Sequence, residues 1–556
     1  MRPLLISAIL VLLSVAVARG APAAAPPVHR LPELHVVDIM PDESTRAPAA
    51  ASILNAETLA RLRPLTLHDA LRFVPGVRTI DDDVNGRRSG ISVRGAPARR
   101  SRKVLLLEDG TPINAATYLD SSAHYTPPME RLARVEVLKG AGHVRQGPIN
   151  NHGVVNFRNV GPTARPDTVV EWAIGNLDTF KRHVRHTRTD GPLGTVFSYT
   201  GFRADGGFDV EDTRFDDFHG SIHWSKSQGQ EWRMSATFFR ERSHYDESNL
   251  TPQEYAVAPR TKRGRFAQEF NTFGLNHWKL DLAHRKRLDE HWTIASKLFS
   301  TEFDRPRFTV EPGVTPVGEL PRIAPSEQFD PARGLGIMIG RDRAYRTLGA
   351  ETQVTHRRSA VEHRSLAHEW QGGVRVERQR LNDRRTAGQA GEVLHVGNRG
   401  SRLRDDAYIG EAISAFLLDK LQWGQWTLTP GVRVERYTQS KQRHALPSDP
   451  GPHGQREKDR TALVLPAVTL LHDGDTAQVF ASIGRGYTPA FARTAAGFPL
   501  QPETGVNMQV GIRRQVAPGF ALEASTFENR IRNTVVQMPF TLDQRDIYLN
   551  SEDSIS

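Results

Sequence analysis

The sequence of 556 residues contains no cysteine. Disulfide bonds, thiolate metal sites and cysteine nucleophiles are therefore all excluded. Hydrophobic residues make up 38% of the chain, which is a low share for a helical membrane protein. After an apolar run that ends at Val17, no stretch approaches the length of about 18 apolar residues that a transmembrane helix requires. Any later membrane crossing must therefore use β strands.

The first residues have the pattern of a secretory signal peptide, predicted over residues 1–18. Arg2 supplies the positive start, Leu4 to Val17 the apolar run, and Ala16-Val17-Ala18 a small-residue cleavage site. The run is short for a membrane anchor, which is the alternative interpretation. Residues 19–47 begin with an Ala- and Pro-rich stretch, and we expect them to form a flexible lead.

The formal net charge of +10 makes nucleic acid a partner to consider. No nucleic-acid-binding module is recognisable, and a secretory signal argues against that partner. A basic surface also attracts lipopolysaccharide phosphates or an anionic ligand. The sequence has no zincin motif, Walker loop or nucleophile elbow, so we predict no catalytic residue, no metal-ligating residue and no enzyme.

The most informative stretch runs from Met129 to Asn159. An alternating strand over Arg134–Leu138 ends at Lys139-Gly140, and a Gly-rich turn leads to a second strand over Val154–Phe157. A strand followed by Gly-x-Gly also begins a dinucleotide fold. Here the third glycine and the following helix are both missing, which disfavours that interpretation. An ordinary turn in another β protein stays open from this stretch alone.

This stretch resembles the plug domain of TonB-dependent outer-membrane receptors. Three flanking motifs resemble the same family and occur in its order: Leu65–Val77, Ile91–Gly95 and Val104–Pro112. We expect helices over Ile53–Leu62 and from Leu65 to Leu71, with Pro75-Gly76 ending the second. The resemblance implies an α/β plug over residues 48–163.

Within the family, the turn is similar to that of ferric citrate receptors. Ala141-Gly142 and Val144–Pro148 carry that likeness. Two positions depart from the family pattern: Gln146 replaces a Tyr, and His152 replaces the first glycine of a Gly-Gly pair.

From Thr168 onward the sequence shows repeated alternating runs, such as Thr195–Phe202 and Trp232–Phe239. Short turns such as Asp190-Gly191 alternate with long polar loops, as in a transmembrane antiparallel β-barrel. A soluble β sandwich is the alternative. The resemblance implies a mainly β fold in which the plug fills the lumen of a 22-stranded barrel. We assign residues 164–556 to the barrel.

The C-terminal end does not fit a complete barrel of this family. The chain stops at Ser556 in a polar segment, and the stretch after Arg165 is short for 22 strands with long outer loops. We expect either a C-terminally incomplete receptor or a naturally shortened copy without function.

The resemblance also implies a TonB box, which pairs as an added strand with the energising protein TonB. We place it at Glu33, Leu34, His35, Val36 and Val37. An ordinary linker is the alternative. Some ferric citrate receptors carry a signalling domain before this box, and from the short lead we expect none here.

A plug latch is expected at Arg94, Glu136 and Lys139. Family plugs carry cations at the positions of Arg94 and Lys139 that pair with carboxylates of the barrel wall. A buried charge pair is costly to break singly, which suits a plug that must be held and then moved.

Two plug loops, residues 96–103 and 114–128, are expected to face outward and bind ligand. Ferric citrate is a compact anion whose iron is already saturated with oxygen ligands, so its receptor needs cations and donors rather than metal ligands. Guanidinium groups bind carboxylates with paired donors. A solvated turn or a lipopolysaccharide contact is the alternative. The predicted ligand-binding residues are Arg99, Arg100, Arg102, Tyr118, His124, Tyr125 and Arg260.

The predicted function is active import of an anionic ferric chelate, such as ferric citrate, across the bacterial outer membrane, with energy from TonB. No resident cofactor is expected, because iron enters only within the chelate. Haem is disfavoured because no histidine lies near Arg485–Pro489. The alternatives are another siderophore or cobalamin as the ligand, a passive or non-functional truncated receptor for a colicin or phage, and a periplasmic or surface enzyme.

Overall fold

The structure is a computed structural model that describes residues 50–81, 89–140, 144–227, 229–244, 252–260, 270–311, 329–358, 366–444, 446, 456–490, 500–517, 520–537, 548–551 and 554–555. The signal peptide and the TonB box, predicted at residues 1–18 and 33–38, lie outside these residues. Among the described residues, no helix combines the length and the hydrophobicity needed to cross a bilayer.

The plug is built on a five-stranded sheet with the order β1-β8-β9-β4-β5. Strands β4 and β9 run parallel, and the other neighbours run antiparallel. The two predicted strands around the Gly-rich turn are confirmed as β8 and β9, which pair across the turn. The bounds are β1 (Ala51–Asn55), β4 (Leu105–Glu108), β5 (Thr111–Pro112), β8 (Leu132–Lys139) and β9 (Gly153–Asn159).

The helix predicted over Ile53–Leu62 begins later than expected, and this part of the prediction was wrong. Residues up to Asn55 form β1, because Ile53 pairs with Glu136 at the edge of the plug sheet. Asn55 then caps helix α2 (Ala56–Leu62) by accepting a hydrogen bond from the Thr58 amide. The second helix, α3 (Leu67–Leu71), starts at a capping box made by Thr66 and Asp69.

Smaller plug elements lie between these strands. They are β2 (Val77–Thr79), β3 (Ile91–Val93), the 3-10 helix η2 (Arg99–Ser101), β6 (Asn114–Ala116), β7 (Asp120–Ala123) and the 3-10 helix η3 (Met129–Arg131). Strand β2 pairs with β3, and β6 pairs with β7.

The remaining chain forms a 17-stranded sheet in which neighbours run antiparallel and follow chain order from β10 to β25, with β28 last. Strands β16 and β17 share partners β15 and β18 and are separated by Pro306, which has no amide hydrogen to donate. The bounds are β10 (Asp167–Ile174), β11 (Phe180–Asp190), β12 (Leu193–Asp205), β13 (Asp212–Ser227), β14 (Gln230–His244), β15 (Thr272–Arg287), β16 (Trp292–Arg305), β17 (Arg307–Glu311), β18 (Ile337–Arg358), β19 (Ala367–Ala387), β20 (Ser401–Trp423), β21 (Trp426–Arg443), β22 (Arg456–Asp473), β23 (Gln478–Thr488), β24 (Glu503–Ala517), β25 (Phe520–Arg532) and β28 (Ser554–Ile555). Helix α4 (Pro252–Val257) and a small hairpin of β26 (Val535–Gln537) and β27 (Tyr548–Asn550) lie beside the sheet.

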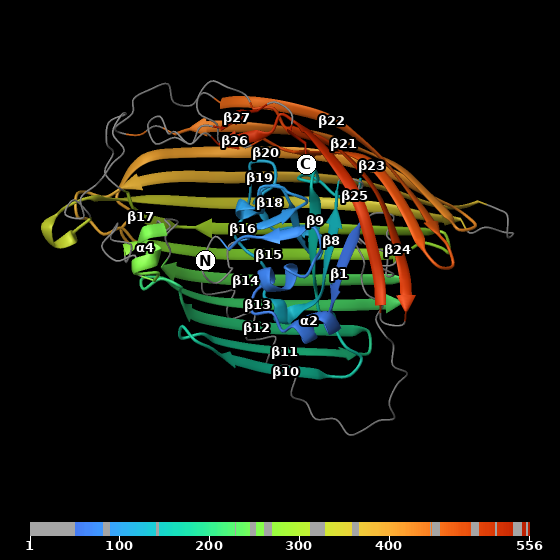
Figure 1. The fold of residues 1–556 in the computed structure, drawn as a ribbon, viewed down its shortest axis with the longest axis horizontal. Helices are drawn as coiled ribbons and strands as arrows, with labels where there is room; N and C mark the ends of the chain where they lie inside the picture. The colour runs from blue at the N-terminus through green and yellow to red at the C-terminus, as the bar shows by residue number, and fades with distance from the viewer. Residues whose placement is uncertain are drawn as a thin grey trace.

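The sheet curves around the plug strands β1, β8 and β9 (Figure 1). Within the described residues, no ladder joins β10 to β25 or β28. Short turns connect the strands at one end, on the right of Figure 1, and long segments connect them at the other, where α4 lies. We call these the short-turn end and the long-loop end. In bacterial outer-membrane barrels the short turns face the periplasm.

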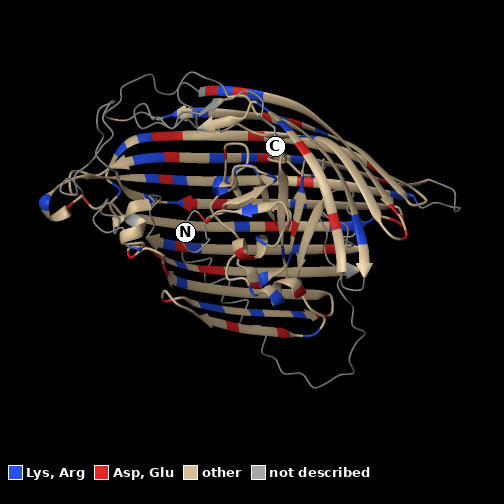
Figure 2. Cartoon of the chain, viewed as in Figure 1, with Lys and Arg blue, Asp and Glu red and all other residues tan. Residues whose placement is uncertain are grey.

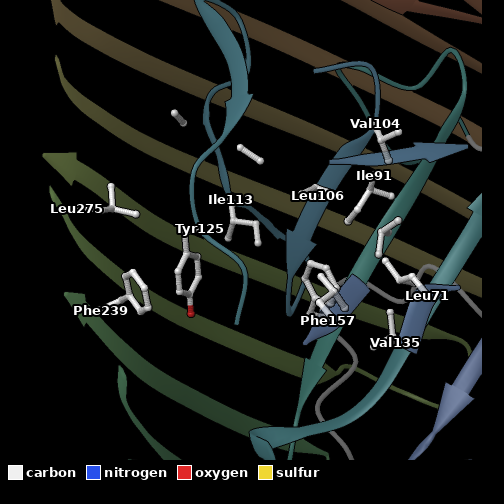
Figure 3. Packing of buried hydrophobic residues seen from close by; sticks show 14 of the residues in the cluster. Leu71, Ile91, Val104, Leu106, Ile113, Tyr125, Val135, Phe157, Phe239 and Leu275 are labelled. Carbon is white, nitrogen blue, oxygen red and sulfur yellow. The ribbon is translucent and has the colours of Figure 1, made fainter. Parts of the chain in front are cut away.

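One hydrophobic cluster joins the plug to the inner wall of the sheet. Figure 3 shows Tyr125 of the plug directed toward Phe239 and Leu275 of the wall, while Phe157 lies deeper in the plug. The rings of Tyr125 and Phe239 are 5.0 Å apart between centroids. The plug is therefore packed against the wall and not merely enclosed by it.

Candidate functional site at the plug and inner barrel wall

Five basic side chains from the plug and the outer half of the wall lie close together. Arg100 belongs to η2, and His124 directly follows β7. Arg305 ends β16, Arg307 begins β17, and Arg343 lies in β18. All five are buried. We call them the cation cluster, and it lies toward the long-loop end, where β16 ends and β18 begins.

Arg305 is the centre of the cation cluster. Only 2% of this residue is exposed, and its Nε has no hydrogen-bond partner among the described residues. Its strongest electrostatic neighbours are Arg343, Tyr345, Arg100 and Arg307, and none of them is a carboxylate. A buried guanidinium that has no counter-ion in the described parts of the chain is unfavourable, so an anion that enters this site would be stabilised.

His124 adds a neutral donor or acceptor to the cluster. Burial lowers the pKa of its imidazole well below the usual value, and the charges of Arg305 and Arg100 act in the same direction. Its Nε2 is buried and has no partner among the described residues. The imidazole is therefore neutral and open to a hydrogen bond from a new ligand.

Two aspartates lie at one side of the cluster, next to Arg343. The Arg343 Nε donates to the Asp383 carboxylate at 3.1 Å, and its Nη1 lies 3.8 Å from the Asp120 carboxylate. The Tyr345 hydroxyl donates to Asp120 at 3.1 Å. These carboxylates balance the charge of Arg343, whereas the charge of Arg305 stays unbalanced among the described residues.

A second buried charged group joins the plug to the wall, and here the charges are balanced. Arg131 of η3 contacts Glu108 of β4 at 3.0 Å and Asp217 of β13 at 2.9 Å. The Tyr125 hydroxyl donates to Asp217 at 3.2 Å, and Lys279 of β15 lies 3.6 Å from Glu108. We call these five residues the anchor.

The charges of the anchor support one another. Burial alone would raise the pKa of the Glu108 carboxyl, but Arg131 and Lys279 hold it well below its usual range. The same carboxylates keep the pKa of Arg131 well above normal in spite of its burial. Glu108 and Arg131 are therefore ionised and paired in this structure, which makes the loss of either partner costly.

The predicted latch residues have different partners. Arg94 donates to the side-chain oxygen of Gln509 on β24 and lies 4.4 Å from the ring centre of Phe527 on β25. Burial lowers the pKa of Arg94 to about 10, with Glu523 acting in the opposite direction. Within the plug, Lys139 donates to Ser52 at 2.9 Å and Glu136 accepts from Arg134 at 2.7 Å. Of the three latch residues, Arg94 forms a hydrogen bond to the barrel wall, whereas the hydrogen bonds described for Lys139 and Glu136 stay inside the plug.

Gly140 makes the position of Arg94 possible. Its φ is +95°, and a Cβ atom there would lie 2.8 Å from the Arg94 Nη1. Only glycine combines this backbone conformation with so close an approach. The predicted Gly-rich turn therefore serves the packing of Arg94 against the wall.

The predicted ligand residues fall into three groups. Arg100 and His124 belong to the cation cluster. Tyr118 and Tyr125 are buried against the wall: the Tyr118 hydroxyl donates to Glu435 at 3.0 Å, and Tyr125 is part of the anchor. These two tyrosines therefore face the barrel wall and not the outer opening.

The other three ligand candidates lie apart from the cluster's centre. Arg99 is exposed, and Arg102 donates to Ser122 at 2.9 Å within the plug. Arg260 is also exposed and donates to the backbone oxygen of Gly207 at 3.1 Å.

Sequence reasoning missed the barrel partners of both charged groups. The barrel partners are inward-facing charged residues on strands whose side chains alternate between the two faces: Arg305, Arg343 and Asp217. Many strands of this sheet carry such charges. Figure 2 shows cationic and anionic residues interleaved along the strands rather than gathered in one patch. Only the pairing of distant strands shows which of them face the plug. A Pro306 between two arginines was the one local signal of a special position.

Comparison with known families agrees with this architecture. Residues 172–554 match the family described as TonB dependent receptor-like, beta-barrel, and residues 43–154 match the TonB-dependent Receptor Plug Domain. The chain belongs to the TonB-dependent receptor family, whose members are transport receptors of the outer membrane and not enzymes.

Individual relatives differ in the ligands that their names give. The chain is 27% identical over 164 residues to the vitamin B12 transporter BtuB of Vibrio vulnificus, covering 30% of this chain and 26% of that protein. It is 31% identical over 137 residues to the ferric enterobactin receptor PirA of Pseudomonas aeruginosa, covering 22% and 18%. The matched segments thus span about a quarter or less of these relatives.

Two solved structures have the same fold. The unliganded ferric citrate transporter FecA superposes with a TM-score of 0.75 at 18% identity, covering 88% of this chain and 71% of that one. The ferric yersiniabactin receptor FyuA of Yersinia pestis gives 0.68 at 16% identity, covering 88% and 73%. At these identities the likeness establishes the fold and not the ligand.

Proposed function

We propose that this protein is an outer-membrane receptor that imports an anionic ferric chelate of the ferric citrate class, with energy from TonB. The proposal of an anionic ligand rests on the surroundings of Arg305. This residue is a buried guanidinium whose strongest charged neighbours are other guanidiniums. A carboxylate-rich chelate supplies the missing counter-charge and accepts the paired hydrogen bonds that guanidinium groups donate.

The ligand would reach the cation cluster from the long-loop end. Arg100 and His124 come from the plug, while Arg305 and Arg343 come from the wall. An anion held by both parts would therefore contact the plug directly and could change its position. We propose that this contact is passed to the TonB box, placed at Glu33–Val37, for engagement by TonB. Iron stays within the chelate, so the protein itself would need no resident cofactor.

Cobalamin is the second candidate, favoured by the segment of 164 residues that matches the vitamin B12 transporter. The cation cluster favours the ferric chelate, because a compact polycarboxylate complex matches several guanidiniums in a small space. A passive receptor on the same fold would bind ligand but not import it.

The test is ferric citrate binding by the full chain reconstituted in lipid. We expect salt-sensitive binding that Arg100→Ala weakens by roughly 10-fold or more, because a hydrogen bond to a charged group contributes about 1.5–3 kcal/mol. Arg99→Ala is the matched control: Arg99 is the neighbouring arginine of the same loop but is exposed, so its loss should have little effect.

Three outcomes separate the candidates. Equal losses in the two variants would contradict the cluster as the binding site. No ferric citrate binding, together with cobalamin binding, would favour the second candidate. Binding without TonB-dependent uptake of labelled iron in cells would identify a passive receptor.

A further inference from the structure

The outer surface of the sheet carries three short rows of tryptophan and histidine side chains. In each row, the three residues lie directly opposite one another on neighbouring strands. We call them the Trp–His rows. Row one is Trp224, Trp232 and His284; row two is Trp292, His356 and Trp370; row three is Trp423, Trp426 and His472.

In each row, the histidine ring packs against a tryptophan ring. The centroid distances are 4.1 Å for Trp232 and His284, 4.4 Å for Trp292 and His356, and 4.5 Å for Trp426 and His472. Aromatic pairs at such cross-strand positions stabilise one another and hold both rings in place.

The rows lie at one level of the sheet. Each row includes one pair of consecutive strands whose connection lies at the short-turn end, on the right of Figure 1. Five of their six tryptophans are exposed to between 40% and 48%. They include six of the eight tryptophans in the chain. So strong a concentration of amphipathic rings at one level is typical of the boundary between lipid chains and headgroups.

The histidines add to the Trp–His rows a polar ring that can either donate or accept a hydrogen bond. An imidazole can present a ring N–H to an acceptor beyond the apolar zone, and a phosphate oxygen is a strong acceptor. Rows one and two also have a cation two residues beyond the histidine on the same strand face: Lys286 after His284 and Arg358 after His356. Both cations are exposed. Row three has Gly474 at the matching position.

We propose that the Trp–His rows bind the phosphates of phospholipid headgroups in the leaflet at the short-turn end. Rows one and two, with Lys286 and Arg358, favour anionic phospholipids, and row three binds headgroups without that preference. The short-turn end faces the periplasm in bacterial outer-membrane barrels, so the phosphates come from phospholipid and not from lipopolysaccharide. The proposal does not depend on which chelate the receptor imports.

The test is native mass spectrometry of the full chain in detergent, titrated separately with phosphatidylglycerol and phosphatidylcholine. We expect phosphatidylglycerol to bind roughly fivefold more tightly, which corresponds to one cation near an anionic headgroup. Lys286→Gln with Arg358→Gln leaves every ring in place, and the ratio should fall to about one. Equal binding of the two lipids by the wild-type protein, or an unchanged ratio in this variant, would overturn the role of the cations.

A second variant tests the histidines. His284→Phe with His356→Phe keeps the stacked rings and removes the N–H donors, so we expect both lipids to bind roughly threefold more weakly. His472→Phe makes the matched change in row three, which has no cation beyond the histidine, and we expect it to weaken the binding of both lipids by the same factor. Retention of wild-type affinity for both lipids in the first of these variants would overturn phosphate recognition by the imidazoles, whatever the outcome of the ferric citrate experiment.

Discussion

The anchor and the cation cluster bury guanidinium groups equally deeply but surround them with opposite charges. Arg131, which is 1% exposed, lies between the carboxylates of Glu108 and Asp217. Arg305, which is 2% exposed, has arginines as its strongest charged neighbours. Burial alone therefore says little about the role of a charge in this lumen. The identity of its neighbours separates a group that pairs the plug with the wall from one that we propose binds a ligand.

The difference has a direct energetic meaning. For a paired buried charge, the attraction of its partner offsets part of the free energy that the charge lost when it left water. An unpaired buried charge has no such compensation, and a bound anion would supply it. The empty receptor should consequently be stabilised by the anchor and strained by the cation cluster.

The largest effect is expected from Arg131→Met. This change removes the cation between the buried carboxylates of Glu108 and Asp217 and leaves only Lys279, 3.6 Å from Glu108, to balance them. Loss of a buried charge partner costs roughly 3–5 kcal/mol. Denaturant unfolding and limited proteolysis of the plug measure it. Arg203→Met is the control, because Arg203 and its partner Asp178 are both largely exposed. Equal stability of the two variants would show that the anchor does not hold the plug.

The next effect is expected from Arg305→Met. Without ligand, the folded protein should be as stable as the wild type or more stable, because repulsion within the cation cluster is relieved. Ferric citrate binding should weaken roughly 10- to 100-fold with the loss of charged hydrogen bonds. Calorimetric titration gives the affinity and thermal unfolding the stability. Unchanged affinity would remove Arg305 from the proposed site.

A smaller effect is expected from pH, through His124. Its pKa in the folded protein lies below the ordinary value of 6.5, so protonation favours the unfolded chain. The contribution of a neutral His124 to stability is full above pH 6.5 and declines as the pH falls below it, by at most about 1.4 kcal/mol per pH unit. His124→Gln should flatten the pH profile of unfolding. A bound anion should flatten it too, because it favours the imidazolium. A profile unaffected by both would contradict the placement of His124 in the cluster.

The smallest effect is expected from Gln509→Glu, which would give Arg94 a carboxylate partner on β24. We expect about 1 kcal/mol of added stability from a charge-assisted hydrogen bond. Gln509→Leu, which removes the present hydrogen bond, should change the stability in the opposite direction. Urea midpoints of the three proteins provide the comparison. A Leu variant as stable as the wild type would show that the hydrogen bond between Arg94 and Gln509 does not stabilise the protein.

Much of the fold could be predicted from the sequence. The strands around the Gly-rich turn, the alternating runs of the sheet and the turn at Asp190-Gly191 follow from local pattern and turn chemistry, and the structure contains all of them. The error at Ile53–Asn55 has a tertiary cause, because these residues are drawn into the plug sheet by β8. Helical periodicity over so few residues cannot compete with that pairing.

The candidate site could be predicted only in part. Arg100 and His124 were found from the charge and position of two plug loops. Their partners could not be found, because Arg305 and Asp217 resemble many other inward-facing charges until the strands are paired. Tyr118 and Tyr125, which are also predicted to bind ligand, pack against the wall, and their role toward ligand stays a prediction. A loop that fills a lumen meets the wall on most sides, and sequence gives no sign of which side is open.

The most direct measurement compares Arg131→Met and Arg305→Met in one experiment: the free energy of unfolding of each, with and without ferric citrate. The charge contrast predicts that Arg131→Met lowers stability in both conditions and keeps the stabilisation by ligand. It predicts that Arg305→Met keeps or raises stability without ligand and loses the stabilisation by ligand. A loss of stability in Arg305→Met as large as that in Arg131→Met, with ligand stabilisation intact, would contradict the division of the lumen into a holding group and a binding group.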